Sequence, residues 1–285
     1  MRLSQICWLF FHVGEASSLC FFPKGKARTL RLHRLQAYAT FLANRVSECI
    51  QSLWIGQKLS AMERLSIASF LANGHEYHLY VYDKIENAPK GTVLKAADEI
   101  LPESMIFQYR KHPSQAGFSN FFRYKLLLSK GGWWADTDVV CLKPFAFGDP
   151  YVFASERVGG QEVPTTAVLK VPPGSEIMEF NWEVCRSCPD PSDVVWGEFG
   201  PQLMQRAIAK FGLRNLIKEA RVFCPLAYDE WEKVLSSEDA SSIDENTHSI
   251  HLWNEMWRRG VRDKEASYAP NCLYEQLKAT FLSRC

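Results

Sequence analysis

The chain has 285 residues, 47% of them hydrophobic, which is enough to bury a sizeable core in one large domain or two modest ones. Its 33 lysines and arginines nearly balance 32 aspartates and glutamates, for a formal net charge of +1 at pH 7. This balance provides no long-range positive field to attract a polyanion, so nucleic acid is not an expected partner.

The nine cysteines are scattered and odd in number, unlike the paired pattern of a small disulfide-stabilised protein. A reducing compartment is the simpler explanation, and we therefore expect a cytoplasmic protein. Cys185 and Cys188 form a C-x-x-C, but no second pair at suitable spacing completes a set of four zinc ligands. Two ordinary thiols are favoured over a zinc or redox site.

Residues 1–49 are interpreted as an N-terminal extension ahead of one domain over 50–285. The apolar stretch ICWLFF is soon interrupted by His12, Gly14 and Glu15, so neither a membrane span nor a signal peptide is expected. The basic stretch 24–34 that follows is interpreted as a solvated leader. Peripheral contact of this stretch with an anionic cytoplasmic membrane face is the alternative.

The next segment alternates between strand and helix patterns. We predict a strand over 49–56 (CIQSLWIG), a helix over 60–74 (SAMERLSIASFLANG) and a strand over 76–83 (EYHLYVYD). A second helix is predicted over 92–101 (TVLKAADEIL) and a short strand over 104–109 (SMIFQY). This order predicts an α/β fold with a mostly parallel central sheet flanked by helices, in which ligands bind at the carboxyl ends of the strands.

A clearly delimited helix is predicted over 117–130. Ser119 suits an N-cap position, Lys130 lies in the last turn, and Gly131 and Gly132 end the helix. Shorter elements are expected beyond Pro144. These are strands over 151–156, 165–171 and 249–253, and helices over 175–185, 200–210 and 271–282.

Two acids interrupt the apolar stretch WWADTDVV that follows this helix. Residues two apart on a strand point to the same face, so Asp136 and Asp138 are expected to project side by side. Two such carboxylates repel each other unless a cation lies between them. Oxygen ligands suit Mg²⁺ or Mn²⁺, which complete their coordination with water and substrate phosphates. The sequence therefore predicts a phosphate-bridging metal site.

Two other motifs share this spacing. An EF-hand loop needs an oxygen ligand and a glycine where Val140 and Cys141 stand, so this interpretation fails. A haloacid-dehalogenase-type phosphotransferase carries D-x-D-x-[TV], in which the first acid attacks phosphorus and the second protonates the leaving group. This alternative stays open, although its motif normally lies on the first strand of the fold.

Four blocks of sequence resemble the glycosyltransferases of family 32, whose sugar-binding region contains a DXD motif and which include enzymes of the α-1,4-galactosyltransferase and capsular-polysaccharide types. The blocks are SLWIGQKLS (52–60), FSNFFRYKLLLSKGGWWADTDVVCLKPF (118–145), EFGPQLM (198–204) and HLWNEMW (251–257).

The resemblance implies a GT-A type fold that uses Mn²⁺ or Mg²⁺. It also implies transfer of a sugar, with retention of anomeric configuration, from a nucleotide-diphosphate sugar to a hydroxyl of a glycan, lipid or polysaccharide. A sugar-nucleotide-binding relative without catalytic activity is a further alternative.

The resemblance also implies roles for individual residues. Asp136, Asp138 and Arg123 are the expected catalytic residues, and Asp136, Asp138 and His251 the expected metal ligands. Trp54 is expected to stack on the nucleobase, and Arg123 to reach phosphate or sugar oxygens. The full set of expected donor-binding residues is Trp54, Ile55, Gly56, Ser119, Asn120, Arg123, Gly132, Asp136, Gly200, Pro201, Trp253 and Asn254.

One position departs from the family pattern. The family commonly has Ser-Asp before the helix arginine, whereas this chain has Ser119-Asn120. Asparagine keeps an acceptor and adds a donor, but it loses the charge-assisted bond to a sugar hydroxyl. The departure leaves the donor sugar open, and an inactive or weakly active variant stays an alternative.

Overall fold

The computed structural model describes residues 48–236 and 243–283. Most of the predicted N-terminal extension, including the basic stretch 24–34, lies outside these ranges. Among the described helices, none is both long and apolar enough to cross a membrane.

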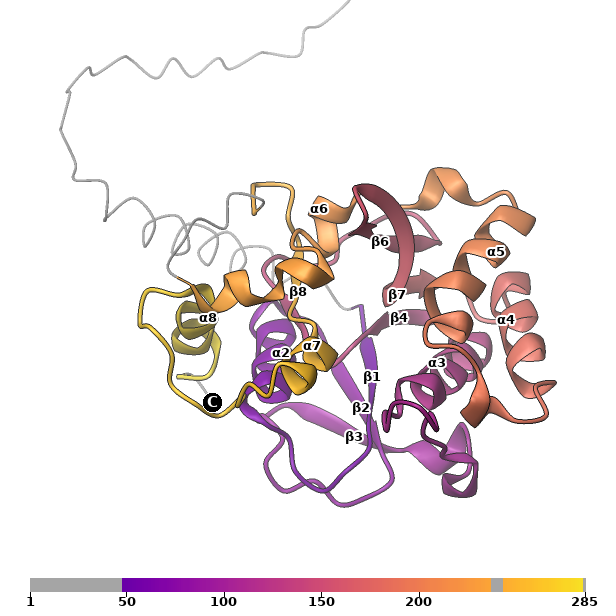
Figure 1. Ribbon diagram of the computed structural model, residues 1–285, viewed down its shortest axis with the longest axis horizontal. Coiled ribbons are helices and arrows are strands. Elements are labelled where there is room, and N and C mark those ends of the chain that lie inside the picture. The colour runs from indigo at the N-terminus through magenta and orange to yellow at the C-terminus, as the bar shows by residue number, and fades with distance from the viewer. Residues whose placement is uncertain (1–47, 237–242, 284–285) are drawn as a thin grey trace, which may run out of the picture. The chain divides into compact units, whose positions relative to one another are not determined.

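The centre of the fold is a six-stranded sheet in the order β3-β2-β1-β4-β7-β6 (Figure 1). Strands β3, β2, β1 and β4 pair in parallel, whereas β7 is antiparallel to both β4 and β6. A separate antiparallel pair joins β5 and β8. The strands are β1 (Ile50–Trp54), β2 (Tyr77–Val81), β3 (Thr92–Ala96), β4 (Gly132–Ala135), β5 (Val139–Cys141), β6 (Val152–Val158), β7 (Gln161–Val171) and β8 (Ser249–His251).

Helices cover both faces of this sheet, which confirms the predicted α/β class. The α-helices are α2 (Ala61–Ala72), α3 (Ala116–Lys130), α4 (Glu176–Arg186), α5 (Leu203–Lys210), α6 (Ala220–Phe223), α7 (Asn254–Arg259) and α8 (Leu273–Phe281). In Figure 1, α3, α4 and α5 lie to the right of the sheet, and α2 and α8 lie to its left.

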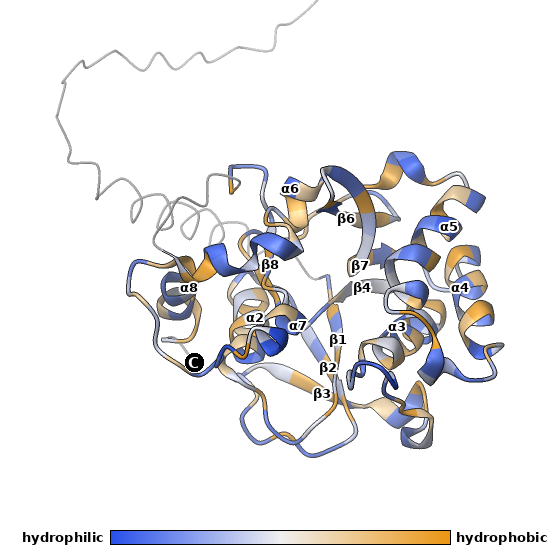
Figure 2. Ribbon diagram, in the orientation of Figure 1, coloured by the Kyte–Doolittle hydropathy of each residue, from blue (hydrophilic) through white to orange (hydrophobic). Residues whose placement is uncertain are grey.

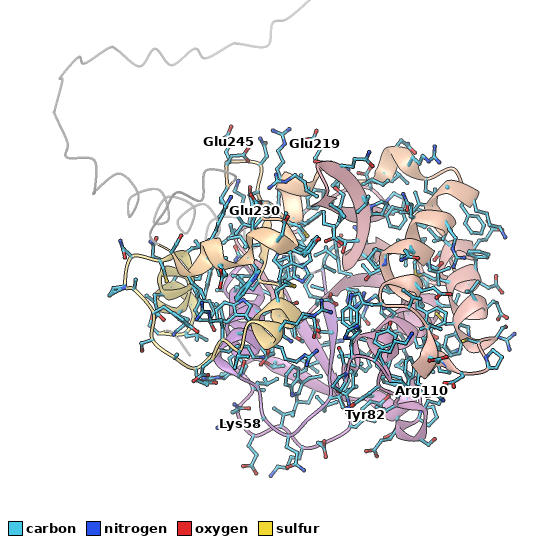
Figure 3. All side chains as sticks on the ribbon, in the orientation of Figure 1. Lys58, Tyr82, Arg110, Glu219, Glu230 and Glu245 are labelled. Atoms are coloured by element: carbon cyan, nitrogen blue, oxygen red, sulfur yellow. The ribbon has the colours of Figure 1, made fainter. Side chains whose placement is uncertain are left out.

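The side chains of β4 alternate between these two layers. Trp134 packs with α3, α4 and α5, and Trp133 packs on the opposite face with residues of α2 and β2; each is 1% exposed. Both tryptophans therefore belong to the core. The helices beside the sheet carry both apolar and polar residues, as expected of helices that pack on a sheet with one face (Figure 2). Charged side chains such as Glu219 and Glu245 lie at the periphery (Figure 3).

Local signals account for the ends of two predicted helices. Ser60 caps α2, where its hydroxyl accepts from the Met62 amide and Glu63 accepts from the Ser60 amide in return. Helix α3 ends at Lys130, and Gly131 follows in a left-handed conformation with φ of 62°. The helices predicted over 175–185, 200–210 and 271–282 are also present.

Two of the predicted elements are wrong. Residues 92–101, predicted as a helix, form β3 and a short 3-10 helix over Ala97–Glu99, because residues 92–96 find backbone partners along β2. Residues 104–109, predicted as a strand, contain a 3-10 helix over Glu103–Met105 and no strand. The order of elements is therefore β-α-β-β before α3.

The predicted N-cap of α3 is also wrong. The helix begins at Ala116 with Gln115 at the N-cap, and that cap forms no side-chain hydrogen bond. Ser119 lies inside the helix, where its hydroxyl accepts a hydrogen bond of 3.3 Å from Arg123. Ser119 thus serves as a hydrogen-bond acceptor for Arg123, one turn later in the helix.

Candidate functional site

The two acids lie in a turn and not on a strand as predicted. Strand β4 ends at Ala135, and β5 begins at Val139. The Val139 amide donates to the Asp136 carbonyl at 3.0 Å and closes the turn, while the Asp136 amide donates to the Ala167 carbonyl of β7 at 2.9 Å. The turn therefore lies at the carboxyl end of β4, next to the point where the sheet changes from parallel to antiparallel.

Pairing of β5 with β8 brings a histidine to this turn. Val139 is the cross-strand partner of His251, and the imidazole Nε2 lies 3.2 Å from Asp138 Oδ2. The Leu252 amide donates to the Asp138 carbonyl at 2.9 Å, and the Asn254 amide donates to Asp138 Oδ2 at 2.7 Å. One potential ligand atom from each of Asp136, Asp138 and His251 lies within 4.8 Å of the other two.

This arrangement fits a divalent cation. In an octahedral shell with bonds of about 2.1 Å, neighbouring ligand atoms lie about 3 Å apart. The separation of 3.2 Å between His251 Nε2 and Asp138 Oδ2 is close to that value. Two carboxylates and an imidazole are also ligands that Mn²⁺ and Mg²⁺ sites accept. The predicted ligand set is therefore brought together by the fold.

The three groups perturb each other's charge. Burial raises the pKa of Asp136; the Arg123 guanidinium opposes this rise, and the charge of Asp138 adds to it. Burial would also raise the pKa of Asp138, but His251 and the Asn254 amide hold it below its ordinary value. Burial favours neutral His251, yet the Asp138 carboxylate keeps the pKa of His251 well above its ordinary value. Asp138 and His251 thus favour each other's charged form across their 3.2 Å contact.

The Arg123 guanidinium forms hydrogen bonds with other side chains of the protein. Its guanidinium is 4% exposed and donates to Asp136 Oδ1 at 2.5 Å and to Asn120 Oδ1 at 2.9 Å. The Trp134 indole donates to the same Asp136 oxygen at 2.8 Å, and its ring lies 4.7 Å from the guanidinium carbon. Arginine and tryptophan together orient the Asp136 carboxylate, which leaves its second oxygen for a ligand.

The position that departs from the family pattern is part of this network. Asn120 is 7% exposed, and its Oδ1 accepts from Arg123 and, at 3.3 Å, from the Thr166 hydroxyl. Gly200 lies directly behind, where an added Cβ would come within 3.2 Å of Asn120 Nδ2. Asn120 therefore joins α3 to β7 and positions the guanidinium.

Asp136, Asp138 and His251 line a cavity of about 890 Å³, a size typical of sites for small organic ligands. Most residues predicted to bind the donor line this cavity. They are Trp54, Ile55, Ser119, Asn120, Arg123, Asp136, Pro201, Trp253 and Asn254, beside Asp138 and His251.

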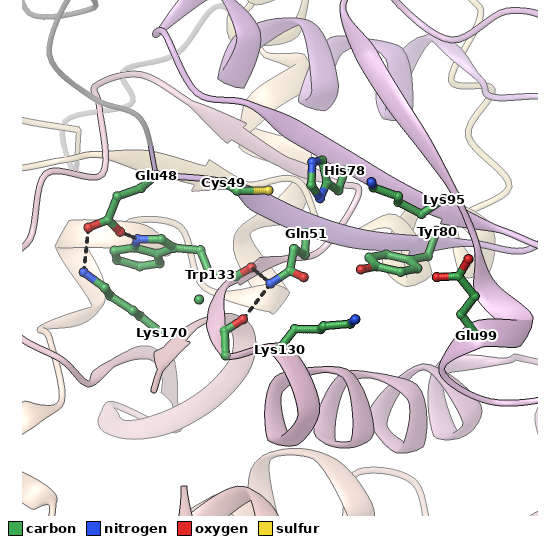
Figure 4. Close-up of a pocket in the computed structure, with 12 residues that line it drawn as sticks. Glu48, Cys49, Gln51, His78, Tyr80, Lys95, Glu99, Lys130, Trp133 and Lys170 are labelled. Carbon is green, nitrogen blue, oxygen red and sulfur yellow. Dashed lines mark hydrogen bonds and ion pairs between the residues drawn. The ribbon is translucent and has the colours of Figure 1, made fainter. Parts of the chain in front are cut away.

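The three predicted glycines do not line it. Gly132 lies at the amino end of β4, opposite the turn, and borders a second cavity of about 520 Å³ with Gln51 and Trp133 (Figure 4). Its predicted contact with the donor is therefore not supported by its position. Gly56 lies beside the Trp54 indole, and Gly200 lies behind Asn120. These two support residues of the cavity from outside it.

Sequence reasoning missed three polar residues of the cavity wall. Glu156 of β6 is 7% exposed, and Thr165 and Thr166 of β7 are 3% and 6% exposed. An acid inside the apolar strand YVFASE was a usable signal of the kind that singled out Asp136. The threonines carried no such signal, because threonine is common in strands.

Comparisons with known proteins agree with this geometry. A family model described as the glycosyltransferase sugar-binding region containing the DXD motif matches residues 44–161. A second, described as the α-1,4-glycosyltransferase conserved region, matches residues 192–281. The first match includes the turn with both acids, and the second includes His251.

Two solved structures are similar to the chain. The PaToxG glycosyltransferase is 13% identical, with 65% of this chain and 82% of that chain covered and a TM-score of 0.42. An active-site mutant of LgtC is 9% identical, with 81% of this chain and 95% of that chain covered and a TM-score of 0.43.

Proposed function

We propose that this chain, which belongs to the glycosyltransferases with a DXD-containing sugar-binding region, moves a sugar from a nucleotide-diphosphate donor to a glycan hydroxyl, with a divalent metal and with retention of configuration. The observation that carries the proposal is the convergence of Asp136, Asp138 and His251 at the edge of one large cavity. The turn with both acids lies at the carboxyl end of a central strand, where ligands of α/β sheets bind.

The cavity offers different surroundings for the parts of such a donor. Trp54 and Ile55 lie at the carboxyl end of β1 and would hold the nucleobase against the flat indole face. Asp136, Asp138 and His251 would hold the cation and, through it, the diphosphate. A bound divalent cation would neutralise the negative charge that develops on the departing diphosphate.

The protein's own groups keep the ligand set in place. His251 and the Asn254 amide orient Asp138, and Arg123 with Trp134 orients Asp136. Because these contacts exist before the donor binds, little reorganisation accompanies the reaction. The acceptor hydroxyl would arrive on the same face of the sugar as the departing phosphate.

The phosphotransferase alternative fits the site less well. It requires Asp136 to attack phosphorus, yet one carboxylate oxygen of Asp136 already accepts from Arg123 and Trp134. The motif also follows β4 and not the first strand. Both family models describe glycosyltransferases.

A melting experiment with nucleotide sugars tests the proposal. Uridine and guanosine diphosphate sugars are added with Mn²⁺ or with EDTA, and release of nucleoside diphosphate is followed in parallel. At least one donor is expected to raise the melting temperature and to be consumed only with the metal. A donor that raises the melting temperature without turnover would indicate a non-catalytic relative. Phosphate incorporation at Asp136, or no effect of any donor, would contradict the proposal.

A further inference from the structure

Glu156 is a buried acid that the proposed mechanism does not use. Its side chain lines the cavity beyond the metal-ligand set, and the residue is 7% exposed. In the described part of the chain no lysine or arginine forms an ion pair with it. Burial raises the pKa of Glu156, while His251 and the Thr165 hydroxyl act in the opposite direction. The cationic group that acts on Glu156 is a histidine already in contact with Asp138, so burial of this carboxylate is costly and favours a role toward a ligand.

The neighbouring strand turns two consecutive hydroxyls toward the same cavity. In a regular strand adjacent side chains point to opposite faces, but Thr165 and Thr166 both line the cavity. Pairing of β6 with β7 shifts register between Phe153 and Ser155, and the two threonines lie in the irregular part of β7. Such irregularities redirect side chains and are frequent beside active sites.

Four polar residues form a belt on the wall of the cavity that also holds the metal-ligand set. We use this name for Asn120, Thr166, Thr165 and Glu156. One end of the belt reaches Asp136 through Asn120 and Arg123. At the other end, Glu156 lines the same cavity as His251, which contacts Asp138. The belt and the two acids therefore share one part of the cavity.

We expect the belt to face the transferred sugar, because it lines the same cavity as the metal-ligand set. The sugar is bonded directly to the diphosphate, so the first polar groups beyond the cation meet its hydroxyls. The nucleobase is separated from the cation by the ribose and the phosphates, and Trp54 lies at the end of β1. A carboxylate and two hydroxyls are suitable partners for sugar hydroxyls, because each offers hydrogen-bond acceptors on a largely buried wall of the cavity.

We propose that Glu156, with Thr165 and Thr166, binds the hydroxyls of the transferred sugar and restricts the donor to neutral sugars. This inference rests on the proposed function. A uronosyl donor would place a second carboxylate next to Glu156, and two buried like charges repel each other or require a proton to be taken up. The negative charge of Glu156 thus selects hexosyl over uronosyl groups.

Binding measurements with and without the sugar test this inference. Calorimetry with Mn²⁺ compares UDP, UDP-glucose, UDP-galactose and UDP-glucuronic acid, and GDP with GDP-mannose, on the wild type and on Glu156→Gln. The variant is expected to bind the diphosphate within about twofold of wild type and the neutral sugar donor about 10- to 100-fold more weakly. Its preference for the neutral over the uronosyl donor should fall at least about tenfold.

Two further variants separate a local effect from a loss of folding. Thr165→Val keeps the shape of the side chain and should weaken binding of the sugar donor but not of the diphosphate. Glu99→Gln is the matched control, because Glu99 borders the second cavity and should leave all affinities unchanged (Figure 4). Melting curves establish that each variant is folded.

The outcomes distinguish the two proposals. Unchanged donor affinity and unchanged discrimination in folded Glu156→Gln would overturn the role of Glu156 while leaving the metal-dependent transfer in place. A wild type that prefers the uronosyl donor would also overturn it. If no nucleotide or nucleotide sugar binds any form of the protein, both proposals fall together.

Discussion

His251 Nε2 lies 3.2 Å from Asp138 Oδ2, although the two residues belong to distant parts of the chain. The contact exists because β8 pairs antiparallel with β5, so that His251 faces the residue after Asp138. The conserved-region match that contains the histidine and the match that contains the acids thus meet at one point.

Removal of the Asp138 charge should abolish metal binding. Asp138→Asn keeps the size of the side chain but loses one anionic ligand and the ion pair with His251. Loss of a residue that only hydrogen-bonds to a metal ligand costs about 10- to 100-fold in metal affinity. Loss of a ligand itself should therefore cost at least about 100-fold. Electron paramagnetic resonance of free Mn²⁺ measures the change. Asp83→Asn, outside the cavity, is the control and should bind Mn²⁺ as the wild type does. Equal Mn²⁺ binding by the two variants would show that Asp138 and His251 do not hold the metal.

Substitution at Asn120 should separate a supporting role from a direct one. Asn120→Asp keeps the acceptor for Arg123 and Thr166 and pairs a new charge with the guanidinium, so activity should be retained or increased. Asn120→Ala leaves the buried guanidinium without that partner, and kcat/KM should fall about 10-fold or more. Steady-state kinetics with the best donor decides between these outcomes. Full activity of Asn120→Ala would mean that the network does not position Arg123.

Trp54 should act through its ring face and not through its indole nitrogen. Its Nε1 is buried and has no hydrogen-bond partner in the described structure. Trp54→Phe should therefore keep most of the nucleotide affinity, whereas Trp54→Ala should lose about 1–3 kcal/mol, the range for stacking of a base on an aromatic side chain. Titration with the nucleoside diphosphate and Mn²⁺ measures both. Equal affinities for Trp54→Ala and wild type would place the nucleobase elsewhere.

Stability should depend on the charge of Glu230 in acid. The carboxylate accepts from Lys233 at 2.6 Å, the Ala227 amide at 3.0 Å and Arg157 at 3.0 Å, and these bonds lower its pKa from 4.5 to about 2. A lowered folded-state pKa contributes stability that is present above about pH 4.5 and is lost as the pH falls toward 2. Because the group is partly exposed, the contribution should be less than about 1 kcal/mol.

Urea unfolding at several pH values between 6 and about 3 tests this dependence. Glu230→Gln should be less stable than wild type near neutrality, and the difference should shrink in acid. Glu245→Gln, an exposed control, should follow the wild type throughout. A difference that does not change with pH would show that the Glu230 charge does not matter.

Two glycines with positive φ should differ in their tolerance of alanine. Gly131 has φ of 62° and Gly159 has φ of 56°, so alanine at either costs at least about 1 kcal/mol of backbone strain, and ψ of −159° adds to the strain at Gly131. A Cβ at Gly131 would also overlap Pro173, whereas nothing lies near Gly159. Gly131→Ala should therefore be more destabilising by about 1–3 kcal/mol in thermal melts. Equal losses would mean that residues around Pro173 move aside at little cost.

Much of the fold could be predicted because local and global preferences agree. Helix α2 has a capping box and apolar spacing, and α3 ends at a glycine. The segment at 92–101 failed because its strand depends on backbone partners in β2, which lie outside any local window. The turn at Asp136 was taken for a strand because apolar residues flank it on both sides.

The sequence by itself determined the chemistry of the site: paired acids of one motif, an arginine one turn after Ser119, and an apolar frame in which charge is costly. The tertiary structure alone decided which groups meet. Pairing of β5 with β8 brings His251 to Asp138, and the irregular pairing of β6 with β7 turns two threonines toward the cavity that Glu156 also lines. Residue type fixes what a group can bind, but only the pairing of distant strands fixes its neighbours, because contact between them depends on the register of the sheet.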